Sequence, residues 1–221
     1  MPIAPIHRLK MMEIRWLASH RCKHGSTYLE HYNCFLKEQP NQERIGFLDI
    51  EASNLKANFG IMFCYCIKVF GKDKIYHRTI TKKELKKNLD KEVVRQCIKD
   101  MMNFDTLVGY YSTKYDFPFI RTRAVMHKLD FPTYGTLKHK DVYYMVRNKF
   151  CLNRNSQETA CRSLLGSTEK NHIDANYWIR ALQGNRKALA YILDHCKRDV
   201  RDLERLYKTV INFRKKADTF M

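Results

Sequence analysis

The sequence has 221 residues, of which 41 are Lys or Arg and 23 are Asp or Glu, giving a formal net charge of +18, and 44% are hydrophobic. This composition excludes a disordered or low-complexity chain, and the length suits one α/β domain with a small appendage. No apolar run approaches the roughly 18 residues of a membrane-spanning helix, and the first residues lack the apolar core of a secretion signal. We therefore expect an intracellular, cytoplasmic protein with no membrane partner, whose positive charge favours nucleic acid.

The cysteines and the distribution of residue types indicate a compartment and a division of the chain. There are eight cysteines, but a chain of this length can bury a core without disulfides, so we expect free thiols and a reducing compartment. Residues 1–44 are rich in His, Cys and basic residues and show no sustained hydrophobic period, whereas a regular apolar pattern begins at residue 45. We predict a Cys/His-rich segment at 1–44 and one larger domain at 45–221.

The larger domain is predicted to begin with strands and to continue with alternating helices and strands. Strands are predicted at 45–51, 60–70 and 75–80, with a turn at 71–74. The capping-box pattern Thr81-Lys82-Lys83-Glu84 predicts a helix that runs to about residue 102. We then expect a strand at 106–111, a helix at 117–129, a short strand ending near Asp141, a helix at 156–165 that ends at Gly166, and a last helix at about 187–214. This order predicts a mixed sheet flanked by helices.

Two acidic side chains interrupt the first predicted strand. Asp49 and Glu51 stand two residues apart, and because side chains alternate along a strand, both carboxylates project from the same face. Two like charges on a buried face are unfavourable unless a cation compensates them, and a divalent metal ion would do so. The alternative is that the pair lies at an exposed end of the strand.

Further acids lie in apolar surroundings later in the chain. Asp116 stands between Tyr115 and Phe117, where it is either a buried carboxylate or the N-cap of the helix that follows. His195 and Asp199 are four residues apart on the last predicted helix and therefore share one face. An amphipathic helix with a solvated Asp is the alternative for this pair.

These segments together resemble a known family. The three motifs of the DEDD-group 3′–5′ exonucleases are similar, in order and approximate spacing, to Phe47-Leu48-Asp49-Ile50-Glu51, to the stretch 109–119 that contains Asp116, and to His195-Cys196-Lys197-Arg198-Asp199. The chain from about 45 to 207 resembles YprB-like ribonuclease H-like domains and, in its second motif, the proofreading domains of family B polymerases. The resemblance implies an α/β fold with an RNase H-like mixed sheet flanked by helices, and a small N-terminal Cys/His-rich appendage.

Two features depart from the family pattern. Tyr111 stands where the polymerase relatives usually have Asn, so the terminal nucleotide would be held differently. In the third motif, His195 precedes Asp199 by four positions, which combines the spacing of the Tyr subgroup with the residue of the His subgroup. The resemblance therefore does not establish that His195 is a general base.

The resemblance implies a metal-dependent 3′–5′ exonuclease that hydrolyses phosphodiester bonds at nucleic-acid ends, and we expect DNA. Two Mg²⁺ or Mn²⁺ ions would be held by four carboxylates, those of Asp49, Glu51, Asp116 and Asp199. By the family pattern, Asp49 bridges both ions, while Glu51 and Asp199 hold the ion that activates water. Asp116 supports the ion near the leaving 3′-oxygen, and His195 would orient or deprotonate the attacking water.

Other residues and other functions remain open at this point. Tyr111 and Phe117 are predicted either to stack on the bases of a single-stranded or 3′ end or to pack in the core, and Asp141 is a further acid near a strand end. The same fold would suit an exoribonuclease or a structure-specific endonuclease. A zinc-containing nucleic-acid-binding module without catalysis is the alternative from another class, but such a module gains nothing from four acids that face phosphates.

The segment at 1–44 contains a second set of potential metal ligands. Cys22, His24, His31 and Cys34 offer two thiolates and two imidazoles within thirteen residues, and zinc binds such mixed tetrahedral sets. We predict one structural Zn²⁺ here, with His20 as a substitute ligand. The alternative is a basic, His-rich surface segment with unrelated thiols.

Overall fold

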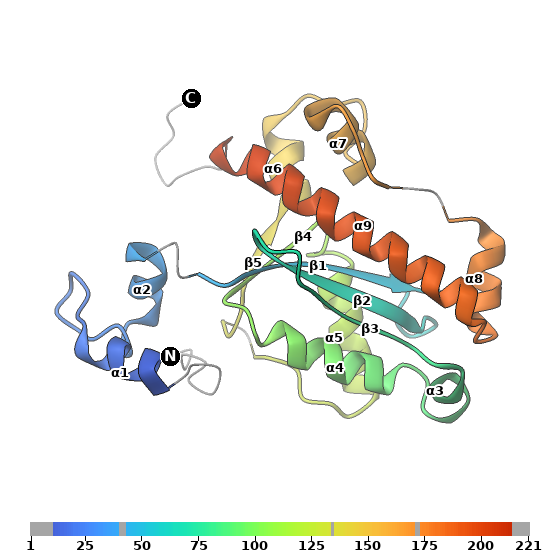
Figure 1. Ribbon diagram of the computed structural model, residues 1–221, viewed down its shortest axis with the longest axis horizontal. Helices are drawn as coiled ribbons and strands as arrows, with labels where there is room; N and C mark the ends of the chain where they lie inside the picture. Colours follow the sequence, from blue (N-terminus) through green and yellow to red (C-terminus); the bar gives the residue numbers. More distant parts are fainter. Residues whose placement is uncertain (1–10, 40–42, 134, 171–172, 214–221) are drawn as a thin grey trace.

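The computed structural model describes residues 11–39, 43–133, 135–170 and 173–213. A small N-terminal unit with two helices lies to one side of a larger unit that is built around a five-stranded sheet (Figure 1). None of the helices in these ranges is long and apolar enough to cross a membrane. The first ten residues and the predicted end of the last helix at residue 214 lie outside the described ranges.

The sheet contains both parallel and antiparallel neighbours. Its strands are, in spatial order, β3 (Ile75–Thr79), β2 (Met62–Val69), β1 (Ile45–Ala52), β4 (Thr106–Gly109) and β5 (Lys138–Asp141). β2 is antiparallel to both β1 and β3, whereas β1, β4 and β5 are parallel. The prediction of a mixed sheet is confirmed, and β1, which carries the first acidic pair, is its central strand.

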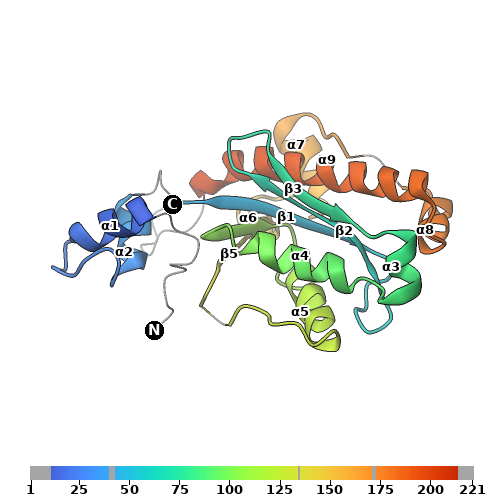
Figure 2. The same cartoon turned by 60° about the horizontal axis from the view of Figure 1, so that its bottom comes forward.

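Helices cover both faces of this sheet (Figure 2). In the larger unit they are α3 (Lys82–Lys87), α4 (Lys91–Met101), α5 (Asp116–Met126), α6 (Val142–Lys149), α7 (Gln157–Leu165), α8 (Ala175–Leu182), α9 (Arg186–Val210) and a 3₁₀ turn at Ile211–Phe213. α9 packs along β1 and β2 on one face, and α4 packs against β2 and β3 on the other, with α5 beside it. α6, α7 and α8 each pack against α9.

The core forms because the central strands are apolar on both faces. All but the last residue of β2 is buried, and Phe47, Leu48 and Ile50 of β1 are at most 3% exposed. In α9, residues such as Leu203 and Leu206 form the apolar stripe that packs on these strands. Any carboxylate on β1 therefore lies where neighbouring side chains largely exclude water.

The predicted continuous helix from residue 82 to 102 is wrong, because the chain forms two helices there. The capping box of Thr81 and Glu84 begins α3 as predicted. Leu89 then adopts the left-handed conformation, with φ of 52°, and separates α3 from α4. The break accompanies a fully buried Asp90, whose carboxylate accepts hydrogen bonds from the backbone N–H of Met62 (2.8 Å) and from Nε of Arg123 (2.9 Å). The free energy gained by pairing the buried carboxylate of Asp90 is larger than the free energy lost by interrupting the helix.

Four of the described helices lie where no element was predicted, namely α1 (Met11–Ser19), α2 (Tyr32–Glu38), α6 and α8. α2 spans seven residues and has no side-chain N-cap, so neither its period nor its cap marks it in the sequence. α6 follows β5 directly, and Asp141 ends the strand and caps the helix at once. By contrast, the predicted end of α7 at Gly166 is confirmed, since Gly166 adopts φ of 75°.

Candidate active site

Three elements of the fold bring the predicted acids together. Asp49 and Glu51 project from β1, Asp116 is the first residue of α5, and Asp199 lies on α9. The side chain of Glu51 is only 14% exposed, so the alternative of an exposed strand end does not apply. The charges of Glu51, Asp199 and Asp116 all act on the carboxyl group of Asp49. The predicted acids therefore form one cluster on the face of β1 that α9 covers.

Asp116 is a buried carboxylate rather than a helix cap. The residue is 3% exposed, and its Oδ1 accepts a hydrogen bond from the backbone N–H of Ile50 at 3.1 Å. The N-cap of α5 is Tyr115, which makes no side-chain cap hydrogen bond. Because Ile50 stands between Asp49 and Glu51, this hydrogen bond joins the start of α5 to the strand at the acidic pair.

His195 lies between two of the acids. Its Nε2 is 3.6 Å from Oε1 of Glu51 and 3.6 Å from Oδ2 of Asp199. Ligand atoms of these three residues lie within 4.8 Å of one another, so they could hold a metal ion. The four-residue spacing on α9 therefore has the predicted consequence that His195 and Asp199 share one face.

Two oxygen atoms of the cluster lack the hydrogen bonds that buried oxygens usually make. Oδ2 of Asp49 and Oδ1 of Asp199 are buried and have no hydrogen-bond partner among the described residues. Such atoms are unfavourable in a folded protein unless a ligand or an ion satisfies them. Carboxylate oxygens are the ligands that Mg²⁺ and Mn²⁺ prefer. The residues present therefore fit the divalent ions that the family resemblance implies.

Burial and mutual repulsion change the acidity of the cluster. Burial, reinforced by the charges of Glu51 and Asp199, raises the pKa of Asp49 well above its usual value. Burial and the charge of Asp199 also raise the pKa of Glu51 to about 8. The pKa of Asp116 rises to about 7 through burial, although hydrogen bonds from backbone N–H groups oppose the change. Without a bound cation, these groups therefore retain protons near neutral pH.

Sequence reasoning missed Lys170, whose ammonium group lies at the acidic cluster. Its Nζ donates a hydrogen bond to Oδ2 of Asp199 at 2.6 Å. Burial lowers the pKa of Lys170, but the charge and hydrogen bond of Asp199 and the charges of Asp49 and Glu51 together outweigh burial, so the pKa is raised. Asp202 holds the preceding loop, because its Oδ2 accepts hydrogen bonds from Oγ1 of Thr168 (2.6 Å) and from the backbone N–H of Glu169 (2.8 Å). A single lysine in a loop carries no pattern that predicts this contact.

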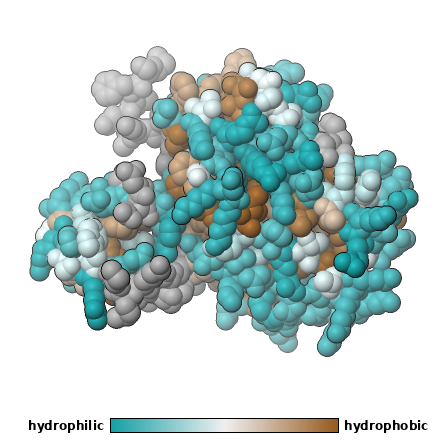
Figure 3. Space-filling view, in the orientation of Figure 1, coloured by the Kyte–Doolittle hydropathy of each residue, from teal (hydrophilic) through white to brown (hydrophobic). Residues whose placement is uncertain are grey.

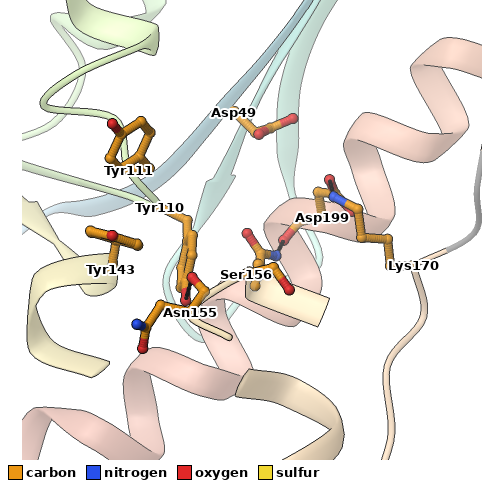
Figure 4. A pocket seen from close by; sticks show the side chains of 9 residues that line it. Asp49, Tyr110, Tyr111, Tyr143, Asn155, Ser156, Lys170 and Asp199 are labelled. Atoms are coloured by element: carbon orange, nitrogen blue, oxygen red, sulfur yellow. Dashed lines mark hydrogen bonds and ion pairs between the residues drawn. The ribbon is translucent and has the colours of Figure 1, made fainter. Parts of the chain in front are cut away.

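A pocket of about 380 Å³ opens beside the acids (Figure 4). It is lined by Asp49, Tyr110, Tyr111, Tyr143, Asn155, Ser156, Gln157, Lys170 and Asp199. Asp199 and Lys170 lie on one side of this pocket, and Tyr111 and Tyr143 lie on the other. The pocket therefore combines charged groups with an aromatic wall.

The loop that carries Tyr111 is held in a constrained conformation. Tyr111 is 45% exposed, has φ of 59°, and packs edge-on against Tyr143 with ring centroids 4.8 Å apart. The carboxylate of Asp141 accepts hydrogen bonds from the backbone N–H groups of Tyr111 (2.8 Å), Thr113 (2.9 Å) and Tyr143 (3.1 Å). A positive φ in a non-glycine residue needs such support. Asp141 therefore positions the aromatic wall.

Phe117 does not line the pocket just described. It is half-buried, packs against the core, and its ring centroid lies 4.4 Å from that of His139. The structure thus brings Tyr111 to the pocket, whereas the stacking of Phe117 on substrate stays a prediction.

A second group of possible metal ligands lies in the N-terminal unit. Cys22, His24, His31 and Cys34 have ligand atoms within 4.8 Å of one another, so the four predicted residues converge. His20, the predicted substitute, is not part of this group. Its ring stacks on Trp16, and its Nδ1 lies 2.8 Å from the carbonyl oxygen of Trp16.

A mixed five-stranded sheet with converging carboxylates is the architecture of the RNase H-like nucleases. A family model described as the RNase H superfamily matches residues 46–211. The chain belongs to this superfamily, and its fold is RNase H-like. No curated protein matches the chain.

Among solved structures, the chain is similar to the family B DNA polymerase from the hyperthermophilic archaeon Pyrobaculum calidifontis, with a TM-score of 0.62 and 16% sequence identity. The similarity covers 77% of this chain and 25% of the polymerase, so the chain spans about a quarter of the length of that protein. At this identity the similarity concerns the fold. It agrees with the resemblance to family B polymerases that the sequence motifs indicate.

Proposed function

We propose that this protein is a metal-dependent 3′–5′ exonuclease that hydrolyses phosphodiester bonds at the ends of DNA. One observation carries the proposal: four acids from β1, α5 and α9 converge, and two of their buried oxygens have no partner among the described residues. The acids are Asp49, Glu51, Asp116 and Asp199. A protein that only bound nucleic acid would be hindered by so much negative charge beside a polyanion.

The four carboxylates are suited to two Mg²⁺ or Mn²⁺ ions. Asp49 would be shared by both, Glu51 and Asp199 would hold the first, and Asp116 would support the second. When bound, such ions neutralise phosphate charge, lower the pKa of water and stabilise the leaving oxygen. The raised pKa values of Asp49 and Glu51 support this assignment, because the ions can replace the protons that the cluster otherwise retains.

Two basic side chains complete the proposed chemistry. The imidazole of His195, 3.6 Å from both Glu51 and Asp199, orients the attacking water and accepts its proton. The ammonium group of Lys170 supplies positive charge to the scissile phosphate from the same side of the pocket. Both groups act beside carboxylates that are largely shielded from water, where charges interact more strongly than in solution.

The aromatic wall supports binding of an unpaired nucleic-acid end. The exposed ring of Tyr111 can stack on a terminal base, and stacking tolerates any sequence. On the basis of the sequence motif, we also propose that the ring of Phe117 stacks on a base of the substrate. The pocket volume of about 380 Å³ lies in the range of sites for small molecules, as a terminal nucleotide requires.

The proposed partner and compartment rest on the charge of the chain and on its cysteines. The net charge of +18 supports binding to the phosphates of single strands or 3′ ends. All eight cysteines are free, which supports a reducing compartment, and we propose the cytoplasm. We assign the exonuclease activity to residues 45–221 and treat residues 1–44 as a separate segment.

Labelled oligonucleotides test the proposal directly. The protein is incubated with 5′-labelled single-stranded and double-stranded DNA and with RNA of the same sequence, in Mg²⁺, Mn²⁺ or EDTA. We expect stepwise shortening of DNA from a free 3′ end, no shortening when the 3′ end is blocked, and no product in EDTA. Preferential shortening of RNA would identify an exoribonuclease, a discrete internal cut an endonuclease, and binding without cleavage a non-catalytic module. Each of these three outcomes contradicts the proposal.

A further inference from the structure

The four converging side chains of the N-terminal unit are arranged through specific atoms. Sγ of Cys22 lies 3.8 Å from Nδ1 of His24 and 3.6 Å from Nδ1 of His31, and Sγ of Cys34 lies 3.3 Å from Nδ1 of His24. Both histidines therefore present the same ring nitrogen to the sulfurs. The backbone supports this arrangement, since the N–H of Gly25 donates to the carbonyl oxygen of Cys22 at 2.9 Å and closes the turn between the first two ligands.

These distances match the edges of a tetrahedral zinc site. Bonds of about 2.3 Å to sulfur and about 2.0 Å to nitrogen at tetrahedral angles place a ligating sulfur about 3.5 Å from a ligating nitrogen. The three sulfur–nitrogen distances, 3.3, 3.6 and 3.8 Å, lie on both sides of that value. Thiol–imidazole hydrogen bonds explain the arrangement less well, because Nδ1 of His24 has one lone pair but faces two sulfurs. A single ion at the centre satisfies all four groups.

The N-terminal unit also has too small a core to fold on apolar contacts alone. Among its described residues, the buried hydrophobic ones are Leu17, Cys22, Tyr28 and Leu36. Figure 3 shows the unit as a separate lobe with mostly hydrophilic side chains on the visible face. Units of fewer than about 40 residues usually need a metal, a disulfide or a partner to fold. In this unit both cysteines are free thiols, which leaves them available to a metal ion.

One ligand is directly linked to the contact between the two units. Tyr32 follows His31 in the chain, and its hydroxyl donates a hydrogen bond to Oδ1 of Asp105 at 3.1 Å. The carboxylate of Asp105 also accepts hydrogen bonds from Nε (3.0 Å) and the backbone N–H (2.8 Å) of Arg44. Asp105 and Arg44 stand immediately before β4 and β1, so Tyr32 contacts the sheet where two of its central strands begin.

We propose that one Zn²⁺, bound by Sγ of Cys22, Nδ1 of His24, Nδ1 of His31 and Sγ of Cys34, folds the N-terminal unit and fixes Tyr32 against Asp105. The ion is structural, because four protein ligands leave no position for substrate. It holds the unit at the start of β1, and the carboxylates lie further along that strand. The proposal is independent of the nuclease activity.

Metal analysis of the full chain purified without chelator tests the ligand set. We expect one zinc ion per chain in the wild-type protein and in Cys151→Ser, because Cys151 is an exposed free thiol outside the cluster. Cys22→Ser and Cys34→Ser should each lose the zinc. Retention of a full equivalent by both variants, or failure of the reduced wild-type protein to take up added Zn²⁺, would overturn the proposal.

A second experiment remains informative if the serine variants do not fold. The wild-type chain is stripped of metal and titrated with Co²⁺, whose visible absorption is intense in tetrahedral sites with thiolate ligands, and Zn²⁺ should then displace it at one equivalent. Hydrogen exchange of the same samples should show residues 17–36 losing protection without metal while β2 and α9 keep theirs. Unchanged protection of 17–36, or no tetrahedral cobalt spectrum, would refute the structural role.

Tyr32→Phe separates metal binding from docking of the unit. This variant keeps all four ligands and should retain one zinc ion, but it loses the hydrogen bond to Asp105. We expect faster tryptic cleavage between the two units than in the wild-type protein, with unchanged zinc content. Cleavage at the wild-type rate would contradict the proposal that His31 and Tyr32 together couple the ion to the sheet.

Discussion

The acidic cluster and the Cys/His cluster are two possible metal sites built in opposite ways. The acids come from positions between 49 and 199 and are brought together by three elements of a large core. The four Cys and His residues lie within thirteen positions, in a unit whose described part has four buried hydrophobic residues. In the first case the fold creates the site, whereas in the second the ion would create the fold.

This difference has a consequence for stability. The acidic cluster holds like charges and two buried oxygens that lack partners among the described residues, so it destabilises the protein when no ion is present. The Cys/His cluster would leave its unit unfolded without an ion but would not affect the sheet. Removal of the ions from the acidic cluster should therefore change the stability of the larger unit, whereas removal of zinc should unfold only the N-terminal unit.

The largest effect is expected for the residue proposed to be shared by both ions. Asp49→Asn preserves the shape of the side chain but removes its charge, and we expect nuclease activity to fall on the order of 1000-fold. Asp73→Asn, in the exposed turn before β3, is the matched control and should keep wild-type activity. The measurement is the rate at which each variant and the wild-type protein shorten 5′-labelled DNA. A variant with Asn at position 49 that remained fully active would show that the acids are not the catalytic site.

A smaller loss of activity is expected for the cation at the cluster. Lys170→Met removes the ammonium group that contacts Asp199 and should lower kcat about 100-fold, because positive charge beside the reacting phosphate is lost. Lys187→Met, an exposed change on α9, controls for the loss of one positive charge from the whole protein. If both variants lose the same modest amount of activity, Lys170 contributes only to general attraction of DNA.

The aromatic wall should contribute mainly to substrate binding. Tyr111→Ala removes the exposed ring and should raise KM about 10-fold, as expected when stacking on one base is lost. Tyr111→Phe keeps the ring and should behave like the wild-type protein. The contrasting result is an equal rise of KM in both variants, which would assign the effect to the hydroxyl group instead of stacking.

The smallest effect is a dependence of stability on pH in the metal-free protein. Because burial raises the pKa of Glu51 from 4.5 to about 8, the folded state binds more protons than the unfolded state in that range, so the free energy of unfolding should fall as the pH rises through it. Glu51→Gln removes the group whose ionisation is unfavourable in the folded state and should melt about 5 °C higher than the wild-type protein at pH 8, with a smaller difference at pH 5. Thermal melts in EDTA that gave the same difference at both pH values would contradict the raised pKa values.

Much of the fold follows from sequence pattern because the central strands are strongly apolar and the turns carry clear signals. The strands around Asp49 and Cys64, the capping box at Thr81 and the glycine end of α7 were all recognisable. The break at Leu89 was not, because it depends on Arg123, more than thirty residues away, pairing with Asp90. Short helices without capping signals, such as α2, were missed because their local sequence contains neither a clear period nor a capping residue.

The candidate site likewise contains some residues that the sequence predicted and others that it did not. Strand alternation and helix spacing indicate that Asp49 shares a face with Glu51 and His195 with Asp199, and the resemblance to the three family motifs predicts that these residues and Asp116 form one site. The roles of Lys170 and Asp141 could not, since each depends on a contact between distant segments: Lys170 with Asp199, and Asp141 with the backbone of Tyr111. Periodicity describes which face a residue occupies, but it does not describe which loop will lie opposite.

Counting bound Mn²⁺ tests most directly whether the four acids form one divalent-ion site. Equilibrium dialysis at pH 8 should give two Mn²⁺ ions per wild-type chain and also two per Cys22→Ser chain, which lacks the zinc site but keeps the four acids. Asp49→Asn should bind at most one. Equal Mn²⁺ binding by the wild-type protein and Asp49→Asn would contradict the account.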